Sequence, residues 1–117
     1  MKKIIFLGVL ILSFICVSQK LNTDKKDHLK ELQGTWGDLD AGVSIKIFLK
    51  NNIAYFQENN DKPLEFKRYN DYIYYTENNI KGLGKVKSCF SYDTKIKRLV
   101  HIPKCEINEW DDSLPRL

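Results

Sequence analysis

From residue 43 onward, apolar and polar side chains alternate in short runs that are separated by turns rich in Asn and Asp. In the first run, residues 43–50, Val43, Ile45 and Ile47 share one side of the backbone. A period of two matches the alternation of side chains across a β-strand. The turn at residues 51–52 is too short for a parallel crossover, which needs about a dozen residues. The pattern therefore predicts strands that pair antiparallel with their neighbours in sequence.

Each run is rich in β-branched or aromatic residues and has the length of a strand. The runs cover residues 43–50, 53–57, 64–69, 72–77, 85–92, 96–102 and 105–110. With a further strand at Trp36, we predict an all-β protein, an antiparallel up-and-down meander of seven to eight strands. Closing the meander into a small barrel would remove its two exposed edges. The alternatives are a two-sheet sandwich and an open sheet covered by a helix.

A short helix is predicted ahead of the strands, over residues 23–34. Leu29 and Leu32 lie three residues apart and would share a face, Asp24 would cap the free N–H groups, and Gly34 would end the helix.

The first 18 residues, 1–18, are predicted to be a secretory signal peptide. Lys2 and Lys3 precede an uncharged, mostly apolar run over residues 4–17. This run is short for a helix that must cross ~30 Å of hydrocarbon.

Small residues at Cys16 and Ser18 predict cleavage after Ser18. Residues 19–117 would then form one exported domain, periplasmic or secreted, with no membrane span. The alternatives are an uncleaved anchoring helix and a lipoprotein acylated at Cys16, which the bulky Ile15 disfavours.

Charge argues against a nucleic-acid partner. Of the 19 Lys and Arg residues, Lys2 and Lys3 would leave with the signal, so 17 would face 15 Asp and Glu. A net charge this small supplies no strong field for binding phosphates.

Cys89 and Cys105 would remain in the exported domain, and an even number of cysteines in an oxidising compartment predicts a disulfide. Closing a loop of about 15 residues stabilises a fold by roughly 3 kcal/mol in the chain-entropy model. Strand alternation opposes the pairing, because it directs Cys89 outward, away from Phe90, and Cys105 to the buried side with Ile107. A bulge at Gly82 or Gly84, or the bend at Pro103, would reset this order.

No enzyme signature is present, and no metal or cofactor is expected. His28 and His101 do not lie in a metal-binding spacing, and both are expected to face solvent, in the helix and in a strand. The serines lack a nucleophile motif.

Two arginines fall on strand faces that otherwise appear buried, Arg68 after Phe66 and Arg98 before Val100. A buried guanidinium must be paired or stacked on an aromatic ring. The alternatives are an arginine that meets an anionic group of a ligand and an arginine that packs over Trp36 at one end of the barrel.

The residues from Leu32 to Trp36, with Gly34 and Trp36 opening the first strand after a helix, resemble the start of lipocalins and small lipocalin-like exported barrels. The resemblance implies that Trp36 closes one end of the barrel under a basic residue from a late strand, for which Arg98 is the candidate. It also implies a cavity for a small apolar or amphipathic molecule.

We therefore expect a non-enzymatic protein that binds a small hydrophobic or amphipathic ligand. The residues expected to line or close its cavity are Trp36, Tyr55, Phe66, Tyr74, Phe90 and Arg98. The alternative is a protein-binding module, or an inhibitor of an envelope or host hydrolase, that acts through loops 37–42, 58–63 and 76–82.

Overall fold

The computed structural model describes residues 19–117, and the predicted signal peptide lies outside the described residues. The prediction of an antiparallel β protein is confirmed. The elements are β1 (Gln19–Lys20), α2 (Leu29–Leu32), β2 (Gly34–Asp38), β3 (Val43–Lys50), β4 (Ile53–Glu58), β5 (Leu64–Glu65), β6 (Lys67–Arg68), β7 (Ile73–Ile80), β8 (Gly84–Asp93), β9 (Arg98–Ile102), β10 (Glu109–Trp110) and β11 (Asp112–Leu114).

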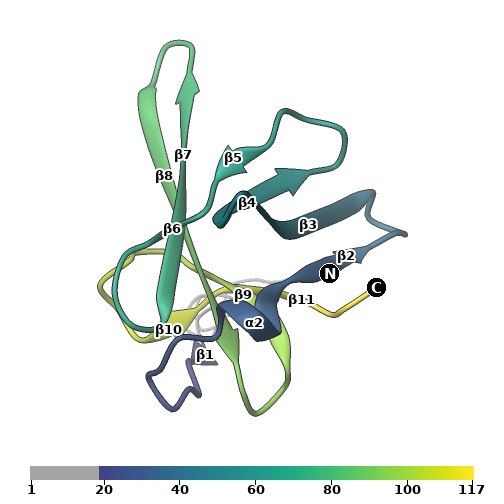
Figure 1. Cartoon of the computed structure of the whole chain (residues 1–117). Coiled ribbons are helices and arrows are strands. Elements are labelled where there is room, and N and C mark those ends of the chain that lie inside the picture. The colour runs from purple at the N-terminus through teal and green to yellow at the C-terminus, as the bar shows by residue number, and fades with distance from the viewer. Residues whose placement is uncertain (1–18) are drawn as a thin grey trace, which may run out of the picture.

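The strands form three antiparallel sheets (Figure 1). One sheet has the order β2-β3-β4-β5, the second has the order β11-β9-β8-β7-β6, and the third pairs β1 with β10. The two larger sheets face each other across the main core, and short turns connect most of their strands.

Phe66 connects the two larger sheets where we predicted one continuous strand over residues 64–69. Leu64 pairs with Phe56 of β4, and the Phe66 N–H still donates to Ala54 O at 2.8 Å. Arg68, two residues later, pairs with Tyr74 of β7. The predicted strand is therefore two short strands, one in each sheet.

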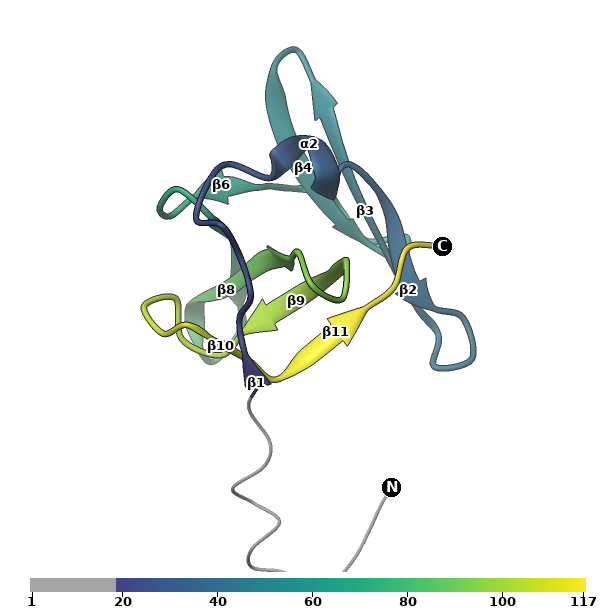
Figure 2. The same cartoon turned by 90° about the horizontal axis from the view of Figure 1, so that it is seen from below.

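The opposite edges of the two sheets also meet, at the C-terminus of the chain. Trp36 and Arg116 form an isolated antiparallel bridge, the Gly37 N–H donates to Pro115 O at 2.9 Å, and Leu117 N–H donates to Thr35 O at 2.8 Å. Figure 2 shows β11 lying between β9 and β2. Within residues 19–117 the strands are divided among separate sheets and no closed barrel is found, so the predicted barrel of seven to eight strands is not confirmed.

The main core fills the space between the two larger sheets, and its middle is aromatic. The ring of Phe90 lies 4.7 Å from that of Phe56, and Phe66 stacks on Tyr74 at 5.2 Å. The buried members are Leu32, Trp36, Ile45, Ile47, Ala54, Phe56, Phe66, Tyr74, Phe90 and Leu99.

A second hydrophobic cluster covers the other face of the five-stranded sheet, which a simple alternating pattern would leave in solvent. It contains Leu21, Ile73, Cys89, Val100 and Ile102, against which residues of the β9–β10 connection pack. Both faces of β7, β8 and β9 are therefore buried along part of their length.

The disulfide between Cys89 and Cys105 is present, as predicted, with Cα atoms 5.4 Å apart. Cys89 does face away from Phe90, but that face is buried under the second cluster, so alternation and the disulfide are compatible. The strand predicted over residues 105–110 is reduced to Glu109–Trp110, because the chain after Cys105 turns, with Ile107 N–H bonded to Lys104 O at 3.0 Å.

The helix is shorter than predicted and covers only Leu29–Leu32. Lys25 has a φ of 57°, which is incompatible with a continuous helix from residue 23. The carboxylate that accepts the first free N–H, that of Leu29, belongs to Asp27 rather than Asp24. No helix within residues 19–117 is long and apolar enough to cross a membrane.

Candidate functional site

One end of the main core is closed by Trp36 and Arg116. Trp36 is fully buried, and its Nε1 donates to Leu32 O at 2.9 Å. The Arg116 guanidinium lies 4.2 Å from the Trp36 ring centroid and donates to Gln33 O at 2.9 Å and to Glu31 O at 2.6 Å. A single cation therefore covers the ring and satisfies two carbonyls at the end of α2.

The expected basic partner of Trp36, Arg98, does not hold that position. Arg98 is exposed at the start of β9, and its Nη1 lies 3.4 Å from Ser113 Oγ. Arg116 occupies the position because the segment after β11 pairs with β2. β2 lies at the edge of its sheet, and an exposed sheet edge is unfavourable unless another segment pairs with it. The expected need for such a partner was the signal that could have pointed to the C-terminal segment.

His28 was expected to face solvent, and this was wrong. Its side chain is 3% exposed, and its ring lies between two carboxylates, with Nε2 2.5 Å from Asp24 and Nδ1 3.2 Å from Glu31. The Tyr92 ring packs 5.5 Å from the imidazole. The sequence did contain a signal for these contacts. Asp24 lies four residues before His28 and Glu31 lies three residues after it, and side chains at these spacings can meet on one side of a helical turn.

Arg68 also lies outside the core. It is about half exposed and forms an ion pair with Asp27, which also accepts a hydrogen bond from the Tyr74 hydroxyl. Burial acts to raise the pKa of Asp27, but the bonds from Tyr74 and the Leu29 N–H, together with Arg68, outweigh it and lower this pKa. Burial, reinforced by the bond to Asp27, raises the pKa of Tyr74 to about 12.

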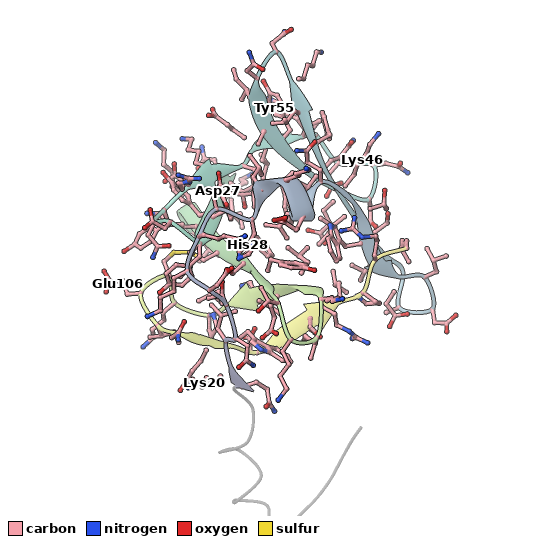
Figure 3. All side chains as sticks on the ribbon, turned by 60° about the horizontal axis from the view of Figure 1, so that its bottom comes forward. Lys20, Asp27, His28, Lys46, Tyr55 and Glu106 are labelled. Atoms are coloured by element: carbon pink, nitrogen blue, oxygen red, sulfur yellow. A yellow bond between two sulfur atoms is a disulfide. The ribbon has the colours of Figure 1, made fainter. Side chains whose placement is uncertain are left out.

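Figure 3 shows Asp27 and His28 together in the segment that leads into α2, and Tyr55 on the four-stranded sheet away from them. This end of the molecule is packed with side chains that already have partners. These contacts hold the fold together at this end.

The opposite end of the core is hollow. A pocket of about 480 Å³ opens between the β4–β5 turn and the β7–β8 hairpin, and we call it the mouth pocket. Its lining residues are Phe56, Glu58, Asp61, Lys62, Leu64, Thr76, Asn78, Ile80, Val86, Ser88 and Phe90. Phe56 and Phe90 are buried, whereas Glu58 and Asp61 are exposed. An apolar base therefore lies beneath a polar rim.

The wall of the mouth pocket carries two small hydroxyl side chains, Thr76 and Ser88. These residues face each other across β7 and β8, and Thr76 is 4% exposed. The side-chain hydrogen bonds within residues 19–117 do not involve either hydroxyl, so both can bond a polar group of a bound molecule.

A smaller pocket of about 260 Å³ adjoins the mouth pocket and shares Phe56, Glu58 and Phe90 with it. His101 lines the smaller pocket, and its ring lies 5.5 Å from Phe90. His101 lies in β9 with its side chain 37% exposed, so it faces solvent in part, as expected. Its Nδ1 is 2.7 Å from Asp111 Oδ1, and this contact orients the imidazole.

The residues expected to line a cavity are separated by the fold. Phe90 lines both pockets, and Phe66 and Tyr74 lie in the aromatic core behind it. Trp36 lies at the closed end. Tyr55 lies on the outer face of its sheet, stacked on Phe48 at 5.6 Å, because it alternates with the buried Phe56.

Sequence reasoning missed Phe56, Thr76 and Ser88 as pocket residues, although each follows the same alternation as Phe90. Within the part of the chain that the structure describes, no group of three or more His, Cys, Asp or Glu side chains is placed to hold a metal ion. Comparison of the chain with protein-family models, with curated proteins and with solved structures gives no match.

Proposed function

We propose that this chain is an exported, non-enzymatic protein that binds a small hydrophobic or amphipathic ligand in the mouth pocket. The observation that carries the proposal is the combination of an apolar base, Phe56 and Phe90, with the hydroxyls of Thr76 and Ser88 above it. The volume of about 480 Å³ lies within the range typical of ligand sites. The aromatic core below limits the depth, so the ligand would sit at the mouth.

The arrangement of the sheets supports the lipocalin-like part of this proposal. The two larger sheets are connected through Phe66 on one side and through the Trp36–Arg116 bridge on the other. We propose that these sheets form one barrel-like wall, with Trp36 and its basic partner at the closed end and the ligand at the open end.

The proposal is tested by titrating a fluorescent apolar probe into the purified exported protein. Saturable binding is expected, with an emission shift typical of an apolar site. Ser88→Phe would fill the pocket and should weaken probe binding at least tenfold. Ser44→Phe is the matched control, since Ser44 is also a half-buried strand serine but does not line the pocket.

Probe binding that does not saturate, or that Ser88→Phe and Ser44→Phe reduce equally, would contradict a ligand site at the mouth. Thermal unfolding of each variant checks that the fold is intact.

Export is tested separately, by mass spectrometry of protein recovered from the periplasm or medium of expressing cells. A chain that begins at Gln19 is expected. A chain with the full N-terminus, or one acylated at Cys16, would contradict the proposed cleavage after Ser18. The disulfide supports an oxidising compartment.

A second candidate function is binding of another protein through the loops. Leu39, at the tip of the β2–β3 hairpin, is 73% exposed and lies between two aspartates, Asp38 and Asp40. This acidic, apolar tip would suit a basic partner surface. A specific partner should be captured from an envelope fraction by the wild type and lost with Leu39→Ser.

A further inference from the structure

The turn between β7 and β8 presents an apolar side chain to solvent. Leu83 is 74% exposed and Ile80 is 39% exposed. The turn is well formed, with the Leu83 N–H bonded to Ile80 O at 2.9 Å. A Cβ added at Gly82 or Gly84 would meet nothing within 4 Å, so there is open space beside both glycines. Figure 1 shows this hairpin extending beyond the other strands, at the end opposite α2.

Positive charges surround the exposed leucine. Lys81 and Lys85 flank the tip and Lys87 follows on β8, and all three side chains are exposed. The ion pairs formed within residues 19–117 do not include any of these lysines. Lys87 lies over the ring of Tyr75 at 4.7 Å, so its charge stays at the base of the hairpin.

We propose that the β7–β8 tip docks on an anionic lipid surface. Leu83 and Ile80 would enter the boundary between head groups and acyl chains, and Lys81 and Lys85 would lie at the level of the lipid phosphates. The positive charge of the lysines argues for an anionic lipid surface as the partner, because apolar groups surrounded by lysine favour a negatively charged membrane over a neutral one.

Docking would bring the mouth pocket to the membrane, since Ile80 and Val86 of the same hairpin line that pocket. A ligand that is soluble in lipid could then exchange between the bilayer and the pocket. The docking itself does not require that the pocket bind anything, so the two proposals are tested independently.

The molecule contains a matched control at another hairpin tip. Leu39 is 73% exposed, which is almost the same as Leu83, but its neighbours Asp38 and Asp40 are acidic. If exposed leucine alone caused membrane binding, both tips would contribute. If the combination with lysine is required, only Leu83 will.

The experiment is cosedimentation of the exported protein with vesicles of phosphatidylglycerol and phosphatidylcholine in equal parts, and with vesicles of phosphatidylcholine alone. Wild type should bind the anionic vesicles and bind less as salt is added. Leu83→Ser should weaken binding about tenfold, from the lost burial of one leucine. Each of Lys81→Gln and Lys85→Gln should weaken it about fivefold, and Leu39→Ser should leave it unchanged.

All variants share one N-terminus, so a difference in binding between two variants comes from the substituted residue and not from that terminus. Far-UV circular dichroism confirms that each variant is folded. The proposal is overturned if wild type does not bind anionic vesicles, if Leu83→Ser binds as wild type does, or if Leu39→Ser weakens binding equally. A concentration-dependent dimer in sedimentation that Leu83→Ser abolishes would assign the tip to self-association instead.

Discussion

The guanidinium of Arg116 lies 4.2 Å from the ring centroid of Trp36, so the C-terminus of the chain covers the residue that closes the core. The contact joins the end of the five-stranded sheet to the first strand of the four-stranded sheet. It also places the positive charge where the carbonyls of Glu31 and Gln33 need donors. One side chain therefore links α2, β2 and the C-terminal segment.

Arg116→Ala should lower the free energy of unfolding by about 1–2 kcal/mol, from the loss of the cation–π contact and of two hydrogen bonds to carbonyls. Urea denaturation followed by circular dichroism measures the change. Arg98→Ala is the control and should change stability by less than about 0.5 kcal/mol, because Arg98 is exposed. Equal effects of the two substitutions would contradict a special role for Arg116.

Gly34→Ala should destabilise the protein more than Gly42→Ala. Both glycines have positive φ values, +135° and +72°, which cost any L-residue energy. Only at Gly34 would the added Cβ meet another group, 2.5 Å from Arg116 Nη1. In an Arg116→Ala background the difference between the two glycine variants should shrink, as unfolding free energies from a double-mutant cycle would show.

Tyr74 should make the fold sensitive to alkali. Its pKa rises from 10.0 to about 12 on folding, so the neutral phenol is favoured in the folded state. The resulting stability is fully present below pH 10 and is lost as the pH rises from 10 towards 12. Urea midpoints measured across this range should fall for the wild type and fall less for Tyr74→Phe. Tyr55→Phe, at a tyrosine on the outer face of the four-stranded sheet, is the control.

Asp27 should make the fold sensitive to acid. Its pKa is lowered below 3.8 in the folded state, so its stabilisation is present above that pH and is lost as the pH falls through the folded value. Asp27→Asn should lower stability at neutral pH and flatten the loss below pH 3.8. Asp71→Asn, at an exposed turn position, should retain the acid dependence of the wild type. Parallel acid profiles for wild type and Asp27→Asn would rule out this role.

Reduction of the Cys89–Cys105 disulfide should lower the free energy of unfolding by roughly 3 kcal/mol, since the residues it links are 16 apart in sequence. Denaturation with and without reductant measures the effect. A Cys89→Ala/Cys105→Ala variant should show the lower stability in both conditions. A reductant effect that persists in this variant would mean that the loss has another cause.

Strand positions were predictable wherever one face of a strand is apolar. The run over residues 43–50 matches β3 in full, and the run over residues 85–92 lies within β8 (Gly84–Asp93). Period-two alternation is a local property, so it survives in any sheet that buries one face. The same pattern placed Phe90 correctly toward the inside.

Breaks within a run were not predictable. The run predicted over residues 96–102 starts only at Arg98, because Lys97 has a φ of 56° and the Asp93 carboxylate holds the N–H groups of Lys95 and Ile96. Such breaks depend on a specific side chain reaching the backbone, which no hydrophobic pattern records.

For this protein, the order of apolar and polar residues alone determined that the chain would form antiparallel strands, since alternation and short turns are local properties of the backbone. Only the tertiary structure decided that Arg116 rather than Arg98 covers Trp36 and that His28 is buried. Each of these outcomes depends on which distant segments of the chain pair and pack against each other. The pairing of sheet edges and the packing of the main core and the second cluster join residues that lie far apart in sequence. A local pattern of apolar and polar residues does not encode such contacts.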